Sequence, residues 1–262
     1  MKILVCVKQI PDDAVAIHLG EDKKPSLMGI SNIVNPFDAY ALEMAVRFKE
    51  CCSSDTKITV ISLGSESVKS TLKDCLAVGA DEAYFVRAER EVIDPYVKAV
   101  MLASGIHQLE QDNEKFSLVM AGKEASDIEF GQTGIYLAGL LEYVTVTGVI
   151  DLQDGEERHS VAVKQETDEG YNLLRVKMPA VLTVARTPYN PRYPTVKSKL
   201  AARRKTIDEL IVNENMSRQT DRLIRLREYE PEKKTAGIRI KGETDSETAS
   251  AAVRRLIDAN ML

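Results

Sequence analysis

The chain has 262 residues, a formal net charge of −5 and 44% hydrophobic residues. This length allows one large domain with an arm or two small domains, and the apolar content allows a sizeable core. The acidic balance argues against nucleic acid as the main partner. The four cysteines and three histidines show no spacing typical of metal ligands or disulfides, and no apolar run reaches the ~20 residues of a membrane helix.

The amino-terminal segment enters a strand pattern directly, because residues 2–8 form a short apolar run. It lacks the basic start, long apolar core and cleavage site of a signal peptide, so we expect a cytoplasmic protein. Pro11, Asp12 and Asp13 then predict a loop, in which the aspartates make turn hydrogen bonds rather than an acid–base pair. Residues 17–31 are polar and predict a small hairpin.

From residue 35 the chain alternates between helix and strand patterns. Asn35 is a candidate helix N-cap, and Pro36 suits the first helical position. A strand at 56–63 precedes a helix that ends at Gly79, and a strand at 82–87 precedes a helix at 94–109. Together with the first strand, this order predicts a Rossmann-like α/β fold, with a mostly parallel sheet covered by helices on both faces.

The stretch 116–141 is the centre of the functional hypothesis. Residues 116–120 suit a buried strand, residues 123–130 a polar loop, and residues 131–141 a helix. A helix N-terminus binds anions through its free N–H groups and its dipole, and Asp127, Gln132 and Thr133 add polar side chains. We interpret this corner as a site for the phosphate and ribose of an adenine nucleotide. The alternative is an ordinary strand-to-helix loop with polar caps.

Ligands of parallel α/β sheets bind at the carboxyl ends of the strands. We therefore expect residues 6–13, 35–38, 63–65 and 122–133 to converge on one pocket. Lys8 and Lys123 lie at strand ends, where either could contact phosphate or stay solvated.

After residue 143 the pattern changes to strands at 144–152, 160–165, 171–177 and 180–184, which we expect as antiparallel additions to the sheet edge. Residues 186–194 carry three prolines and predict an exposed loop, and residues 196–205 are basic. From about residue 207 no core pattern is evident until an amphipathic helix at 245–259. This tail predicts an arm that folds against another surface, the alternative being a helical appendage on its own domain.

Several stretches together resemble the beta (small) subunit of electron-transfer flavoproteins, in the order found in that family. They are VCVKQIPD, NPFDAYALEMAVRFKE, CLAVGADEAYFV, LVMAGKEASDIEFGQTG, KMPAVLTV, NPRYPTVKSKLAARRK and TAGIRIKG, and they span nearly the whole chain. The resemblance implies an adenine nucleotide alpha hydrolase-like arrangement of the predicted sheet. It also implies a non-enzymatic electron carrier that works as a heterodimer with a larger alpha subunit.

In that family, the redox FAD sits mainly on the alpha subunit and the beta subunit holds a structural AMP. Electrons pass from flavin dehydrogenases, such as acyl-CoA dehydrogenases, to a quinone-linked acceptor. Electron-bifurcating members hold a second FAD in place of AMP and use NADH. The resemblance assigns the AMP site to Cys6, Asn35, Pro36, Phe37, Asp38, Leu63, Gly122, Lys123, Glu124, Ala125, Ser126, Asp127, Gly131, Gln132 and Thr133.

The resemblance also implies a partner-recognition loop at 184–198, with Pro188 where the family often has an apolar anchor. Its candidate contact residues are Pro188, Tyr189, Asn190, Arg192 and Tyr193. Asp13 occupies a place where some members present an aromatic residue to the flavin. Residues 1–205 would then form the nucleotide-binding domain, and residues 206–262 an arm that packs on the alpha subunit.

Two features favour AMP over a second FAD. The loop SDIEFGQTG has Thr133 and no proline after Gly134, unlike the loop of bifurcating members, and Ile135 with Tyr136 would narrow the pocket. The rival class is an ATP-binding α/β enzyme or sensor. That class usually has a glycine- or serine-rich loop after the first strand, whereas this chain has QIPDDA.

Overall fold

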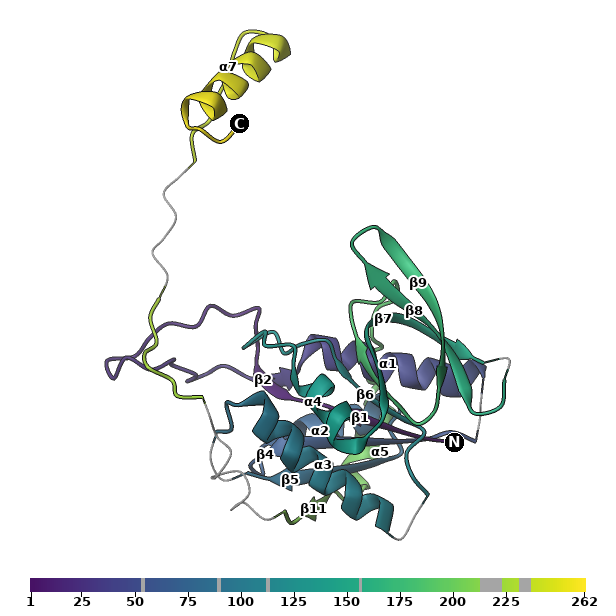
Figure 1. The fold of residues 1–262 in the computed structure, drawn as a ribbon. Helices are drawn as coiled ribbons and strands as arrows, with labels where there is room; N and C mark the ends of the chain where they lie inside the picture. Colours follow the sequence, from purple (N-terminus) through teal and green to yellow (C-terminus); the bar gives the residue numbers. More distant parts are fainter. Residues whose placement is uncertain (53–54, 89–90, 112–113, 156, 213–222, 231–236) are drawn as a thin grey trace. The chain divides into compact units, whose positions relative to one another are not determined.

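The computed structural model describes residues 1–52, 55–88, 91–111, 114–155, 157–212, 223–230 and 237–262 (Figure 1). They divide into two units. One comprises Met1–Ile17 and Ser26–Leu226, and the other comprises His18–Pro25 and Arg227–Leu262. Residues 213–222 and 231–236 of the predicted arm lie outside the described residues, as do the first two residues of the TAGIRIKG motif.

The first unit is built on a nine-stranded sheet with the order β11-β5-β4-β1-β6-β10-β7-β8-β9. All neighbours from β11 to β7 are parallel, and β8 and β9 are antiparallel. The Rossmann-like α/β class expected from the sequence is confirmed. The strands are β1 (Lys2–Cys6), β4 (Lys57–Gly64), β5 (Glu82–Arg87), β6 (Leu118–Gly122), β7 (Val144–Asp154), β8 (Ser160–Thr167), β9 (Gly170–Lys177), β10 (Ala180–Val184) and β11 (Asp208–Leu210).

The expectation of four antiparallel edge strands is right for β8 and β9 and wrong for β7 and β10. Strand β10 lies inside the sheet, parallel to both β6 and β7. All five residues of β10 are buried and apolar or small, which suits a strand covered on both faces. The sheet also continues to β11, so it extends past residue 205, where the sequence placed the start of the arm.

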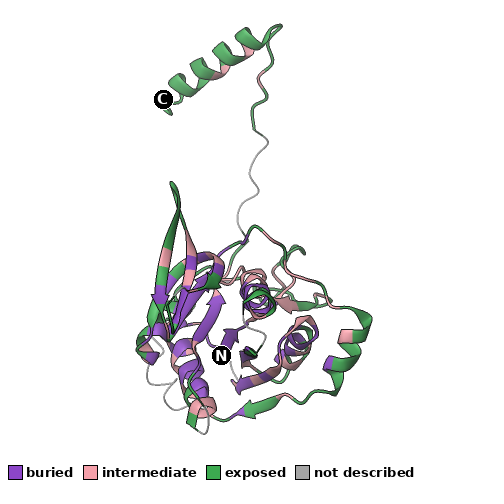
Figure 2. Cartoon of the chain, turned by 90° about the vertical axis from the view of Figure 1, so that its right-hand side faces the viewer, coloured by how far each residue is buried: buried purple, intermediate pink, exposed green. Residues whose placement is uncertain are grey.

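In the part of the chain that the structure describes, five helices cover the two faces of the sheet. Helices α1, α2 and α5 share one buried cluster with alternate sheet residues such as Ile3 and Val5, whereas α3 and α4 share the other with Leu4 and Cys6. Figure 2 shows this buried interior in purple. Side chains alternate across a strand, so one short apolar run serves both layers. The helices are α1 (Pro36–Cys51), α2 (Val68–Val78), α3 (Pro95–Gln111), α4 (Thr133–Leu141) and α5 (Val196–Arg204).

The loop after β1 contains more regular structure than the sequence predicted. Strand β2 (Gln9–Pro11) pairs antiparallel with β3 (Asn32–Val34) to form a small second sheet. The predicted turn is present, because the carboxylate of Asp12 accepts a hydrogen bond from the Ala14 N–H at 3.1 Å. Within the expected hairpin, only Leu19 and Pro25 form an antiparallel bridge among the described residues.

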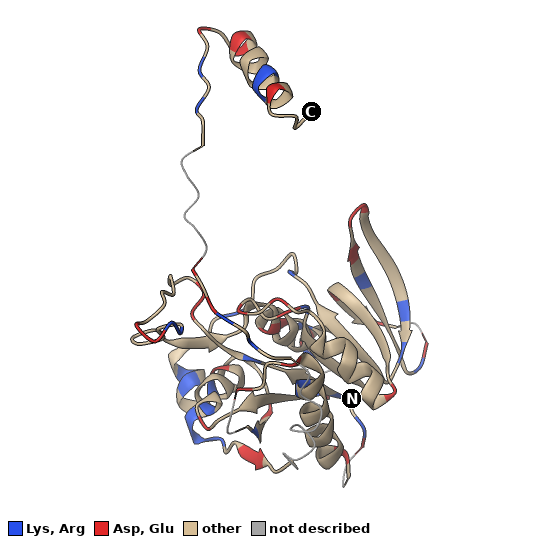
Figure 3. Ribbon diagram, turned by 60° about the vertical axis from the view of Figure 1, so that its left-hand side comes forward, with Lys and Arg blue, Asp and Glu red and all other residues tan. Residues whose placement is uncertain are grey.

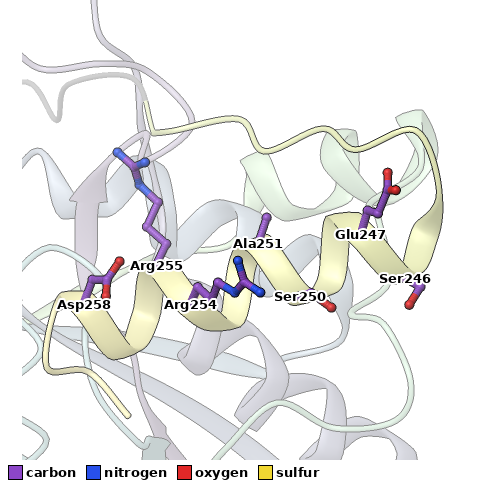
Figure 4. A pocket seen from close by; sticks show the side chains of 7 residues that line it. All are labelled: Ser246, Glu247, Ser250, Ala251, Arg254, Arg255 and Asp258. Carbon is purple, nitrogen blue, oxygen red and sulfur yellow. The ribbon is translucent and has the colours of Figure 1, made fainter.

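The second unit contains helix α7 (Asp245–Asp258), close to the predicted 245–259. Thr244 caps it, since its hydroxyl accepts a hydrogen bond from the Glu247 N–H at 3.2 Å. None of its residues is buried. The hollow drawn in Figure 4 is lined by α7 residues alone: Ser246, Glu247, Ser250, Ala251, Arg254, Arg255 and Asp258.

Candidate nucleotide-binding site

The carboxyl ends of β4, β1 and β6 lie side by side at one edge of the sheet, and the loops that follow them form the candidate site. Val7 continues the β1 ladder, because its N–H donates to the Ile61 carbonyl of β4 at 2.8 Å. On the other side, the Lys123 N–H donates to the Val184 carbonyl at 2.7 Å. The sheet therefore fixes where the loops after β1 and β6 begin.

Asp38, in the first turn of α1, joins two of these loops. Its carboxylate accepts hydrogen bonds from the Lys8 N–H at 2.7 Å and the Gly122 N–H at 2.8 Å. The residue is only 6% exposed. Burial raises the pKa of Asp38 to about 6, although the two backbone hydrogen bonds act in the opposite direction. Asp38 thus holds together the loops that follow β1 and β6. The Gly122 N–H donates to this carboxylate and is therefore not available as a donor to a phosphate.

Asn35 precedes α1 but does not cap it with its side chain, contrary to the sequence prediction. Its amide group is directed to the loop after β6 instead. The Asn35 Nδ2 donates to the Glu124 carbonyl at 2.8 Å, and its Oδ1 accepts from the Ser126 N–H at 3.1 Å. A side chain that makes both bonds to the neighbouring loop is not available to its own helix. Pro36 does occupy the first turn, as expected.

Gly122 is required by this close approach of the loop to α1. A Cβ at this position would lie 2.5 Å from Asp38 Oδ1 and 2.6 Å from Phe37 Cβ, well inside normal contact distances. Ala125 then turns the loop, since its carbonyl accepts the Ile128 and Glu129 N–H groups. The first turn of α1 and the loop at 122–129 consequently form one interlocked corner.

Helix α4 follows this loop and begins at Thr133, two residues later than predicted. Gln132 occupies its N-cap position without a side-chain cap hydrogen bond. The first N–H groups of a helix lack intrahelical partners, so this N-terminus offers donors to an anion. A Cβ on Gly134 would lie 2.6 Å from the Thr183 side chain, so α4 starts close against β10.

Lys8 and Asp127 form an ion pair across the corner, with the Lys8 Nζ 2.6 Å from Asp127 Oδ2. A second link joins the loop after β2 to the same region, because the Ser126 hydroxyl donates to the Asp13 carboxylate at 2.8 Å. Lys98 lies in the first turn of α3. Burial, and next the positive charge of Lys8, lower the pKa of Lys98 to about 8.

Most of the predicted site residues fall into two groups that share Glu124, whereas Pro36 lies at the start of α1, Ala125 in the loop after β6, and Gln132 and Thr133 at the start of α4. Asn35, Phe37, Asp38, Gly122, Glu124, Ser126 and Asp127 are brought together with Lys8, and Cys6 and Leu63 lie at the ends of the adjacent strands β1 and β4. Lys123, Glu124 and Gly131 line a different hollow of about 480 Å³, together with Ile135, Thr183 and residues of β7 and β8. The role of all these residues in nucleotide binding remains a prediction.

Two residues of α3, Tyr96 and Lys98, were not among the site residues predicted from the sequence. Tyr96 of α3 meets Tyr136 of α4 edge-on, with ring centres 5.5 Å apart. Lys98 belongs to the same first turn of α3. A lysine in the first turn of a helix is unfavourable for the helix dipole, and this unusual position is the feature of the sequence that could have drawn attention to Lys98.

The segment that follows β10 is held against α1. The Arg192 guanidinium binds Glu43 at 2.8 Å and Glu50 at 2.7 Å, and Arg47 lies 4.3 Å from the ring centre of Tyr189. Hydrogen bonds to Glu50 and Glu43 raise the pKa of Arg192 above its usual range. Of the predicted recognition residues, Pro188, Asn190 and Tyr193 are exposed, whereas Arg192 and Tyr189 turn toward α1.

Residues 28–215 match the family model described as the electron transfer flavoprotein domain. The chain belongs to the electron transfer flavoprotein family. The resemblance to its beta subunits found in the sequence is confirmed. The family's electron-carrier role agrees with the expectation that this chain is not an enzyme, and the family implies association with a flavin.

Three relatives of this family member are informative. The electron transfer flavoprotein subunit beta of Megasphaera elsdenii is 35% identical over 215 residues, covering 80% of this chain and 78% of the relative. The human subunit beta is 31% identical over 249 residues, 94% of each chain. Subunit CarD of the caffeyl-CoA reductase-Etf complex of Acetobacterium woodii is 31% identical over the whole of both chains. In the part of this chain that the structure describes, no helix has the length and apolar character needed to span a bilayer.

Proposed function

We propose that this chain is the beta subunit of a heterodimeric electron-transfer flavoprotein, with AMP bound at the corner of β1 and β6. The interlocked corner carries the nucleotide proposal, because Asp38 and Asn35 fix two loops beside an uncapped helix N-terminus. The flavin of the larger alpha subunit, when bound, supplies the redox chemistry. This chain positions that flavin domain and docks the electron donors and acceptors.

The residues present fit an adenylate. The start of α4 offers uncapped N–H donors to a phosphate, and Asp127 and Gln132 offer acceptors and donors to the ribose. The edge-on contact of Tyr96 with Tyr136 joins the first turns of α3 and α4 beside this helix start. Ile135 lines the hollow beside β7 and β8 together with Lys123, Glu124 and Gly131, and the narrowing of the nucleotide pocket by Ile135 and Tyr136 stays a prediction.

The alternative is a bifurcating subunit that binds a second FAD and uses NADH. This alternative is supported by the similarity to CarD, whose name places it in a caffeyl-CoA reductase complex. The second alternative, an ATP-binding enzyme or sensor, lacks support in the QIPDDA loop after β1.

We further propose that residues 206–262 include an arm that packs on the alpha subunit. No residue of α7 is buried, which supports this, because an amphipathic helix is stable when its apolar side chains are covered. Its exposed Val253, Leu256 and Ile257 are the candidate contacts. Flavin dehydrogenases would dock through loop 184–198 and the basic helix α5, whose lysines and arginines are blue in Figure 3.

The deciding experiment is mass spectrometry of ligands released from the purified complex, with its absorption spectrum. A yellow heterodimer that releases one AMP and one FAD supports the proposal. Two FAD per heterodimer would establish the bifurcating alternative, and a colourless protein that hydrolyses ATP would refute the carrier function.

Variants extend this test. We expect Gln132→Ala and Asp127→Ala to loosen AMP and lower the melting temperature, while electron transfer per intact dimer changes little, because ligand binding stabilises only the native state. Gln153→Ala, on an exposed residue of β7, is the matched control. Nucleotide-free variants with wild-type melting temperature would contradict a stabilising role of AMP.

A further inference from the structure

The docking segment, residues 185–195 between β10 and α5, has no regular secondary structure, but its exposure alternates. Ala185, Thr187 and Tyr189 are buried or half-buried, whereas the residues between them are exposed. The Ala185 N–H donates to the Val149 carbonyl at 2.9 Å, and the Thr187 hydroxyl donates to the Tyr189 carbonyl at 2.6 Å. A segment without a helix or strand ladder keeps one conformation only where contacts of this kind fix it.

A charged stripe of α1 supports this segment. Glu43, Arg47 and Glu50 are spaced by four and three residues, which places them along one side of the helix. Other residues of α1 pack into the buried cluster on the sheet, and the hydrogen bonds of Asp38 fix its first turn. The stripe is therefore a firm support for the segment that lies against it.

Arg192 uses its whole guanidinium group on this stripe. Nε and one terminal nitrogen donate to the Glu43 carboxylate at 2.8 and 3.2 Å, and both terminal nitrogens donate to the Glu50 carboxylate at 2.7 and 2.9 Å. The Arg192 backbone N–H also donates to Glu43 at 3.2 Å. Bidentate pairs of this kind fix the orientation of a guanidinium. We call these three residues the α1 clamp.

The burial of Glu43 keeps Arg192 in the clamp. The Glu43 side chain is only 5% exposed, and a buried carboxylate without its cation is strongly unfavourable. An Arg192 that turned toward a partner would leave Glu43 in that state. Arg47 adds a second contact, because its guanidinium carbon lies 4.3 Å from the centre of the Tyr189 ring.

We propose that Arg192 and Tyr189 position the docking segment and do not touch the electron donor, which meets the exposed side chains of the segment, such as Tyr193. This inference rests on the proposed docking of flavin dehydrogenases through loop 184–198. Tyr193 is 92% exposed, whereas all three guanidinium nitrogens of Arg192 are engaged within the chain. A segment that is ordered before docking loses less entropy when the donor binds. The α1 clamp therefore affects the affinity for the donor and leaves the electron-transfer step unchanged.

The test uses the intact heterodimer, with an acyl-CoA dehydrogenase and its acyl-CoA substrate as the electron donor, and measures kcat and the KM for the heterodimer. Glu43→Gln is the most informative variant, because a side chain that is 5% exposed cannot touch a docked donor. We expect this variant to raise KM by about fivefold at unchanged kcat, because the segment is then ordered only during docking.

The Arg192 variants complete this series. Arg192→Met should raise KM by about tenfold at unchanged kcat. Combining it with Glu43→Gln should raise KM no further, because both changes remove the same interaction. Arg192→Lys should lie between the wild type and Arg192→Met, since an ammonium lacks the planar fork that binds both carboxylates.

A second measurement follows the docking segment directly. Trypsin cleavage after the exposed Arg186 requires local opening of the segment, so Glu43→Gln and Arg192→Met should be cut faster than the wild type at this bond under native conditions. Lys57→Met is the matched control, because it breaks an exposed ion pair with Glu82 at the amino ends of β4 and β5. It should keep the wild-type KM and cleavage rate.

The possible outcomes separate the roles of Arg192. A raised KM in Arg192→Met with a wild-type KM in Glu43→Gln would overturn the inference, because Arg192 would then contact the donor itself. A wild-type KM in both variants, or a fall in kcat alone, would also overturn it. A wild-type heterodimer that no flavin dehydrogenase reduces would instead refute the carrier function, and the cleavage rates would still show whether the α1 clamp holds the segment.

Discussion

Replacing Gly122 with alanine tests the interlocked corner most directly. The added methyl group would lie 2.5 Å from Asp38 Oδ1, 2.6 Å from Phe37 Cβ and 2.9 Å from the Asp38 backbone nitrogen. Two of these atoms belong to the backbone or Cβ of α1, which packs on the sheet, so they cannot move aside as a flexible side chain would. The loop after β6 must therefore withdraw from α1.

The expected cost has two parts. Overpacking of this kind costs roughly 1–3 kcal/mol. Loss of the Gly122 N–H bond to the Asp38 carboxylate, 2.8 Å long in the structure, adds roughly 1.5–3 kcal/mol. A total of roughly 2.5–6 kcal/mol lowers the melting temperature of a chain of this size by roughly 10 °C or more. We also expect the purified complex to retain less AMP, because the phosphate corner opens.

Gly139→Ala is the matched control, since no atom lies within 4 Å of a Cβ at that position of α4. It should be neutral or add up to about 1 kcal/mol, because alanine favours helix. The chain has no tryptophan, so far-ultraviolet circular dichroism is the suitable probe of thermal and urea unfolding. If Gly122→Ala melts within about 2 °C of the wild type and retains AMP, the interlocked corner does not hold the site together.

Three further predictions follow from the same contacts. Because the folded-state pKa of Asp38 is about 6, above its usual 3.8, its contribution to stability is fully present below pH 3.8 and is lost as the pH rises through 6. The urea stability of the wild type relative to Asp38→Asn should therefore fall by roughly 2 kcal/mol between pH 4 and pH 7, and a constant difference would contradict the assigned pKa. Arg192→Met leaves the carboxylate of Glu43, which is 5% exposed, without its cation and should lower the free energy of unfolding by about 2–3 kcal/mol. Arg192→Lys should recover part of this stability. An equal loss of stability in both variants would show that packing matters more than charge. Gly134→Ala should lower the melting temperature, because its Cβ would lie 2.6 Å from the Thr183 side chain, and an unchanged melting curve would show that α4 can move away from β10.

The sequence predicted the elements of the first half of the chain well, because their signals are local. The apolar run of β1, Pro36 at the start of α1 and Gly79 at the end of α2 each specify an element through neighbouring residues. The convergence of residues 6–8, 35–38 and 122–127 also followed from the rule for carboxyl ends of parallel strands.

The contacts within the site could not be predicted in the same way. Asn35 has the signature of an N-cap, and only the position of the loop 91 residues later shows that its amide group binds Ser126 instead. Asp38 similarly bonds to residues 30 and 84 positions away. The strand at 180–184 carries no local signal of its neighbours, so its parallel position inside the sheet was missed.

The insertion of β10 between β6 and β7 has a consequence for biosynthesis. Strand β6 finds its second neighbour only after the chain has emerged from the ribosome as far as residue 184, more than 60 residues later. Until then, one ladder edge of a fully apolar strand is open to pairing with other chains. The same late arrival supplies the Val184 carbonyl that anchors Lys123, so a nascent chain that ends in the β8–β9 hairpin has an incomplete nucleotide corner. Chaperone dependence and aggregation of truncated products should therefore be greatest for chains that end between β7 and β10.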